Sequence, residues 1–207
     1  MKTPSLPRFE EHVPTAAVAY CHTLWQHHAF AFLVTRPRRT RLGTHCFHPL
    51  SGHRVTINTN LNPFAFLITY LHEVAHVLTV RDAQRNFPGR RRVLPHGRQW
   101  KAHFQTLLLP ALTERIFPLS ILEPLRGYAQ NPAAATASCL PLAKALQALD
   151  QIPDHLMEVR HLAEGERFEF GKRIFIRGRL RRTRLLCVEL PTGRRYTVPV
   201  HALVKRI

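Results

Sequence analysis

Acidic side chains are scarce in this sequence: 13 Asp and Glu stand against 30 Lys and Arg in 207 residues, a net charge of +17. The four cysteines are scattered, and none of them forms a Cys-x-x-Cys pair. The first 14 residues lack the apolar core of a signal peptide, and no apolar run approaches the roughly 20 residues that span a bilayer. These absences predict reduced thiols, no membrane partner and a cytoplasmic location. A cytoplasmic location is compatible with association with the nucleoid.

The bulk composition is that of a folded protein. Hydrophobic residues make up 45% of the chain and charged residues 21%, which is too apolar for disorder, and glycine and proline show no fibrous period. The length allows one domain or one and a half.

The positive charge favours a polyanionic partner, above all a nucleic acid. Ribosomes, acidic lipids or mere solubility are the alternatives. Arginine predominates over lysine, which suits bidentate phosphate contacts, although each cluster can equally be a solvated face. The candidate nucleic-acid-binding residues are Arg38, Arg39, Arg41, Arg90, Arg91, Arg92, Arg181, Arg182 and Arg184.

The first part of the chain alternates helical and extended patterns. Apolar residues recur at helical spacing over residues 14–29, and alternation predicts strands at 31–35 and 53–58, with a turn at 36–43 entering a short edge strand. Asn62-Pro63 is a favourable helix start, and the almost wholly apolar run that follows, to Val80, predicts a central buried helix. A basic loop at 81–95 precedes a second helix at about 96–109.

From about Glu164 the pattern changes to alternating strands separated by glycine turns. This predicts an antiparallel β module over residues 156–207, joined by a helical linker at 133–155 to a domain formed by residues 1–132. Four aromatic residues of the module can serve either as stacking platforms for bases or as its own core: Phe168, Phe170, Phe175 and Tyr196.

The central helix carries His72-Glu73-Val74-Ala75-His76, an H-E-x-x-H motif. Residues four apart lie one turn above each other, so both imidazoles can face one ion. Glu73 points about 100° away and can hold a metal-bound water instead. The alternative is a pair of core histidines satisfied by backbone or by Glu73.

A catalytic zinc requires three protein ligands and one open position. Thr79 and Asp82 occupy the places where a metzincin would have glycine and histidine, so that pattern is excluded. Glu114 is the candidate for a thermolysin-like arrangement, but His96 is the better third ligand because it begins the next helix.

Together with His96-Gly97-x-x-Trp100, the motif resembles the SprT-like (Spartan-type) zinc metallopeptidases over roughly residues 14–131. The segments Tyr20-Cys-His-x-Leu-Trp25, Arg39-x-Arg41-Leu42-Gly43 and Asn58-x-x-Leu61 fit the same resemblance.

The resemblance implies a zincin-like helical domain with a small three-stranded sheet. Together with the C-terminal β module that the strand pattern predicts, the expected fold class is α+β. It also implies one Zn²⁺ per chain, held by His72, His76 and His96, with Gly97 and Trp100 packing behind the ligands. Glu73 is then the general base that activates the zinc-bound water of an endopeptidase.

Members of this family are associated with DNA, which implies DNA-associated or DNA-crosslinked proteins as substrates and single-stranded or damaged DNA as a partner. The chain departs from many of them at its C-terminus, where they carry a four-cysteine zinc ribbon and this module has only Cys187. We therefore interpret the module as a ribbon-like unit without its metal. The main alternative is a nucleic-acid-binding protein whose zinc is structural and which has no peptidase activity.

Overall fold

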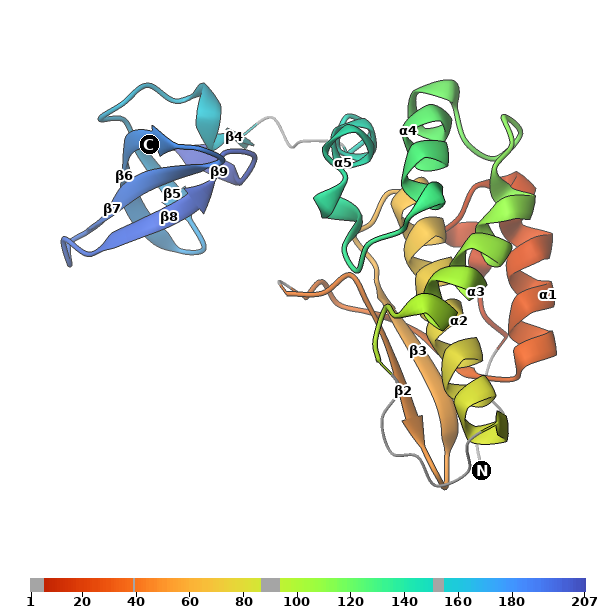
Figure 1. Cartoon of the computed structure of the whole chain (residues 1–207). Coiled ribbons are helices and arrows are strands. Elements are labelled where there is room, and N and C mark those ends of the chain that lie inside the picture. The colour runs from red at the N-terminus through yellow and green to blue at the C-terminus, as the bar shows by residue number, and fades with distance from the viewer. Residues whose placement is uncertain (1–5, 39, 87–93, 151–154) are drawn as a thin grey trace. The chain divides into compact units, whose positions relative to one another are not determined.

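The computed structural model describes residues 6–38, 40–86, 94–150 and 155–207. The chain divides into two units, Met1–Asp150 and Gln151–Ile207, which are described separately (Figure 1). The described residues contain five α-helices, a three-stranded sheet in the first unit and a six-stranded antiparallel sheet in the second. The α+β class with a separate antiparallel β module is thus confirmed.

The small sheet of the first unit has the order β1-β3-β2. Strand β1 (Ala31–Thr35) runs parallel to β3 (Gly52–Asn58), and β2 (Gly43–His48) runs antiparallel to β3, with Gly43 opposite Ile57. The expected short edge strand is therefore β2, and the short 49–51 connection makes β2 and β3 a hairpin.

Helix α2 (Pro63–Asn86) is the centre of the first unit and packs against β2, β3 and α3 (Figure 1). Asn62 caps it, because its side-chain Oδ1 accepts the amide of Ala65 at 2.9 Å. By length and composition α2 could cross a membrane, but 61% of its most apolar 18-residue window is buried inside the protein. It is a core helix, as the sequence predicts.

Two helix boundaries differ from the sequence-based expectation. The first helix, α1 (Val18–His28), is preceded by a separate 3-10 turn at Thr15–Ala17. Helix α2 continues past Val80 to Asn86, because no proline or glycine interrupts it and its last turns have tertiary partners. Asp82 contacts the His103 ring at 2.8 Å, and the Arg81 guanidinium donates to the backbone carbonyl of His28.

The remaining helices of the first unit are α3 (Arg98–Leu108), α4 (Leu119–Gln130) and α5 (Leu140–Gln147), with 3-10 turns at Phe9–Glu11, Leu109–Ala111 and Thr136–Ser138. Helix α5 falls in the stretch for which the sequence predicts a linker, 133–155, yet Leu142 and Leu146 are buried in the core of the first unit. The side chain of Asn62 also donates to Leu146 O at 3.0 Å and to Asp150 Oδ1 at 2.7 Å. The first unit thus extends well beyond residue 132.

The second unit is a sheet with the order β4-β9-β5-β6-β7-β8 and its own hydrophobic core. A meander of four strands is followed by β9, which returns to pair with β5 and β4. Its strands are β4 (Met157–Glu158), β5 (Arg167–Phe170), β6 (Arg173–Arg181), β7 (Arg184–Leu190), β8 (Arg195–Pro199) and β9 (Leu203–Arg206), with a 3-10 turn at Val159–His161.

Aromatic side chains fill that core instead of forming a platform. Phe168 and Phe175 are buried, with ring centroids 5.6 Å apart. Tyr196 packs against the same core and is covered by the Arg173 guanidinium, 4.5 Å from the ring centroid. Phe170 packs against the core as well. The stacking role considered for these residues is therefore excluded for Phe168 and Phe175.

Candidate metal centre

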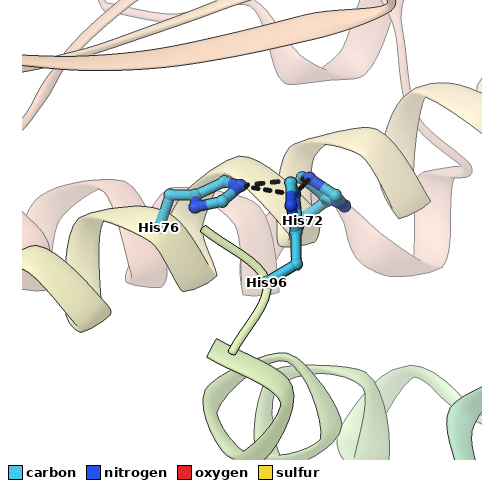
Figure 2. Close-up of side chains that lie close together, drawn as sticks. All are labelled: His72, His76 and His96. Carbon is cyan, nitrogen blue, oxygen red and sulfur yellow. Dashed lines mark hydrogen bonds between the residues drawn. The ribbon is translucent and has the colours of Figure 1, made fainter. Parts of the chain in front are cut away.

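Three histidine side chains converge beside helix α2. His72 and His76 lie one turn apart on α2, and His96 reaches them from the segment before α3 (Figure 2). Their Nε2 atoms are 3.2 Å apart for His72 and His76, and 3.0 Å apart for each pair that includes His96. Within the described part of the chain, this is the one group of three or more His, Cys, Asp or Glu residues with a metal-binding arrangement.

The geometry and the protonation state of the three rings fit a cation. In a tetrahedral zinc site with Zn–N bonds of 2.0–2.1 Å, the nitrogens lie roughly 3.3 Å from each other. Burial, with a contribution from the neighbouring rings, lowers the pKa of His72 and of His76 to about 3, and burial lowers the pKa of His96. All three are therefore neutral near pH 7, which is the form that ligates a metal. A neutral Nε2 carries either one hydrogen or one lone pair, so at least two of the three facing nitrogens are of the same kind, an arrangement that a bound cation would relieve.

The backbone before α3 is shaped to present the third ring. His96 has φ = 59°, in the left-handed region that a non-glycine residue occupies only at some cost, about 1 kcal/mol. Gly97 follows as the N-cap of α3, and a Cβ on it would lie 3.3 Å from the carbonyl oxygen of Leu94. Such a strained residue held in place next to a ring cluster is typical of a functional site.

Trp100 packs behind all three rings. It is fully buried, and its ring centroid is 4.6 Å from those of His72 and His96 and 5.5 Å from that of His76. Its indole N–H donates to the backbone carbonyl of His72 at 3.3 Å, and the Phe104 ring stacks on it with centroids 5.0 Å apart. One side chain thus contacts both histidines of α2 and His96 together.

Glu73 is buried and lines the same cavity as the three histidines. Burial raises the pKa of its carboxyl to about 8, although a hydrogen bond from the backbone amide of His45 and the positive charge of Arg38 act in the opposite direction. The carboxyl lies against β2: a Cβ on Gly43 would be only 2.6 Å from Glu73 Oε1. The sequence predicts Glu73 beside the metal but not this contact with the sheet, since it depends on the pairing of distant segments.

The cavity has a volume of about 760 Å³. The chain before β2 and the first residues of β2 form one wall, and α2 forms another, with the His96 segment and residues 134–136 completing it. Residues 134–136 belong to the stretch for which the sequence predicts a linker.

The histidines of β2 and β3 have other partners. His45 Nε2 lies 2.9 Å from His53 Nδ1, and the His45 ring is nearly parallel to that of His76, with centroids 6.3 Å apart. Cys46 is exposed, and His48 Nδ1 accepts the amide of Leu50 at 3.2 Å, so the described residues form no second cluster there. The register of β2 on β3 brings His45 and His53 together, and the sequence alone does not fix that register.

The candidate nucleic-acid-binding arginines divide into four groups. Arg38 is engaged within the sheet: its guanidinium donates to Asn58 Oδ1 at 2.8 Å, Thr56 Oγ1 at 3.0 Å and Thr44 Oγ1 at 3.2 Å. Arg41 is exposed at the cavity wall. Arg181, Arg182 and Arg184 are exposed in the second unit. The others lie outside the described residues: Arg39, Arg90, Arg91 and Arg92.

The chain was compared with protein families, curated proteins and solved structures. No family model, no curated protein and no solved structure matches the chain significantly.

Proposed function

We propose that this protein is a zinc-dependent endopeptidase of the SprT-like type, with a zincin-like first unit, acting on DNA-associated or DNA-crosslinked proteins. The single observation that carries the proposal is the convergence of three imidazole Nε2 atoms, 3.0–3.2 Å apart, in one cavity with a buried carboxylate. Three neutral nitrogen ligands and an open fourth position are the donor set of catalytic zinc, whereas structural zinc has four closed protein ligands.

In this proposal each residue has a distinct task. His72, His76 and His96 would hold the zinc ion, which would polarise the scissile carbonyl and lower the pKa of a water molecule to about 7. Glu73 takes the proton of that water and returns it to the leaving amide nitrogen. Its burial supports this role, because a carboxyl group whose pKa lies near the working pH can both accept and donate a proton.

A protein substrate is supported by the position of β2. Strand β2 is at the end of the sheet order, so no described strand pairs with its outer edge. The cavity wall includes Gly43, Thr44 and His45 of that strand. An extended peptide can add to such an edge through main-chain hydrogen bonds, which would lay the peptide across the three histidines.

Peptide cleavage by Glu73→Gln protein tests the proposal. The variant should keep its zinc, since Glu73 is not a ligand, and should lose casein or histone cleavage by a factor of about 10² to 10⁴. A chelator should abolish cleavage by the unaltered protein. Cleavage retained by Glu73→Gln, or unaffected by the chelator, would overturn the assignment.

The nucleic-acid part of the proposal is supported by the β6–β7 hairpin. Arg181 and Arg184 are directly opposite each other in its register, and Arg182 occupies the turn with φ = 53°. Like charges facing each other across strands are destabilising, and a non-glycine residue at such a φ is strained. None of the ion pairs found among the described residues involves these three arginines. A polyanion would supply the missing negative charge.

The alternative is a nucleic-acid-binding protein with a structural zinc site and no peptidase activity. It predicts zinc binding and salt-dependent nucleic-acid binding, with no cleavage of casein or histone in the presence or absence of single-stranded DNA. The buried carboxyl of Glu73 beside the three rings favours the peptidase.

A further inference from the structure

We infer that the edge strand β2 positions the general base: the bare Cα of Gly43 and the backbone amide of His45 together fix where the Glu73 carboxylate lies. This inference rests on the proposed function, because it assigns a role relative to the base of that reaction. It makes Gly43 and the β2 backbone positioning elements that act through Glu73.

Gly43 fits against Glu73 and Thr69 without room for a side chain. A Cβ at this residue would lie 2.6 Å from Glu73 Oε1, 2.8 Å from Glu73 Cγ and 2.7 Å from Thr69 Cγ2. Each distance is shorter than a van der Waals contact, so any side chain at Gly43 must displace the strand, or else both Glu73 and Thr69. Gly43 is not among the residues with positive φ, so its backbone conformation is open to alanine. The requirement for glycine here is therefore one of space.

Strand β2 is held firmly by its neighbours, so an added side chain at Gly43 should move the Glu73 carboxylate and not the strand. Gly43 and Thr44 pair with Ile57 and Thr56 in the register of β3. The Arg38 guanidinium bridges Thr44, Thr56 and Asn58, with donor–acceptor distances of 2.8–3.2 Å. The Asn58 amide group in turn donates to the backbone carbonyl of Arg41 at 2.9 Å, so the chain entering β2 is anchored as well.

The backbone of β2 also contacts the Glu73 carboxylate directly. The backbone amide of His45 donates a hydrogen bond to the Glu73 carboxylate. An amide on a paired strand cannot rotate as a side chain does, so this contact restricts the direction in which the carboxylate points. The missing side chain of Gly43 lets Glu73 approach the strand closely, and the His45 amide contacts it there. A displacement of about 1 Å in such a group is enough to lower the rate roughly a hundredfold.

The experiment compares Gly43→Ala with Gly127→Ala. Gly127 is in α4, and a Cβ there would meet nothing within 4 Å, so its substitution is the matched control. Zinc content, kcat and KM on a casein peptide are measured for both. We expect Gly43→Ala to bind zinc as the unaltered protein does, and its kcat to fall roughly tenfold to a hundredfold, with KM changed by less than about threefold. Gly127→Ala should match the unaltered protein.

A double-mutant cycle with Glu73→Gln separates positioning from general damage. Glutamine removes the base but keeps the shape of the side chain, so a loss that acts only through the base cannot occur in its absence. In the Glu73→Gln background, Gly43→Ala should therefore change the residual kcat by less than about twofold. Independent, multiplicative losses would contradict the inference.

Three further outcomes are distinguishable. Loss of zinc or of folding in Gly43→Ala would assign Gly43 a structural role and overturn the inference. The added substitution Thr69→Ser removes the methyl group that clashes with the new Cβ. If it restores folding and zinc binding while the kcat defect remains, the inference stands. Full activity of Gly43→Ala beside inactive Glu73→Gln would also overturn it. Full activity of Glu73→Gln would instead overturn the proposed function itself.

Discussion

The indole nitrogen of Trp100 donates a hydrogen bond to the backbone carbonyl of His72, 3.3 Å away. This bond joins α3 to α2 at the level of the first proposed ligand, and the Trp100 ring contacts the other two histidine rings as well. The packing behind the three rings therefore depends on Trp100, and in the proposed site the metal affinity should depend on it too.

Trp100→Phe should lower the zinc affinity roughly tenfold to a hundredfold, because it removes the donor but keeps an aromatic ring behind the ligands. Trp100→Ala should also lower the free energy of unfolding by about 3–5 kcal/mol, because it empties a fully buried site. Trp25→Phe is the control, since the Trp25 indole also donates to a backbone carbonyl, that of Phe30 at 2.9 Å, and is not part of the ring cluster. Equal effects of Trp25→Phe and Trp100→Phe on zinc affinity, measured by competition with a chelating dye, would contradict this account.

Removal of zinc should destabilise the first unit. A ligand that binds only the folded state stabilises it by about 2.7 kcal/mol when its free concentration is 100 times the dissociation constant. We expect a chelator to lower the midpoint of thermal unfolding of the first unit and to leave that of the second unit unchanged, since all three histidines belong to the first. An unfolding curve that is identical with and without chelator would contradict a metal site coupled to folding.

Acid should destabilise the protein over the range in which His28 titrates. Burial, together with the nearby His27, Arg81 and His103, lowers the pKa of His28 from 6.5 to about 4. Between these values the unfolded chain binds a proton that the folded protein does not, so the free energy of unfolding falls as the pH falls from 6.5 towards 4. His28→Gln should show a shallower fall in urea unfolding between pH 7 and pH 4.5. A slope as steep as that of the unaltered protein would contradict the assignment.

Nucleic-acid binding should weaken when the β6–β7 hairpin loses its charge. We expect the triple variant Arg181→Ala, Arg182→Ala, Arg184→Ala to bind single-stranded and duplex DNA more weakly. The slope of log affinity against log salt should become less negative by about 2–3, since each lost phosphate contact changes it by 0.7–0.9. The control is the triple variant Arg8→Ala, Arg126→Ala, Lys144→Ala, which removes the same charge from the first unit. There Arg8 is paired with Glu11, and Arg126 with Glu123. Equal losses in both triple variants would show an effect of net charge alone.

Local signals in the sequence predict the parts of the fold that local interactions determine. The Asn62 cap, the apolar run of α2 and the strand at 31–35 each depend on residues close together in the chain. The proximity of His72 and His76 follows from helical spacing alone. The place of His96 beside them depends on a turn with positive φ, which no pattern of residue types reveals by itself.

Tertiary contacts explain what the sequence does not predict. The stretch around α5 is punctuated by proline and reads as a linker, but Leu142 and Leu146 are buried by residues far away in the chain. Arg38 belongs to a basic cluster in the sequence, whereas in the structure its guanidinium bridges β2 and β3. The contact of Gly43 with Glu73 likewise requires a strand and a helix to meet, and only the folded chain brings them together.

Zinc content of the purified protein tests the central claim most directly. The account predicts one equivalent of zinc per chain, lost in His96→Ala and retained in His103→Ala, whose altered side chain lies on α3 and contacts Asp82 at 2.8 Å. A protein without zinc, or a His96→Ala variant that keeps a full equivalent, would contradict it.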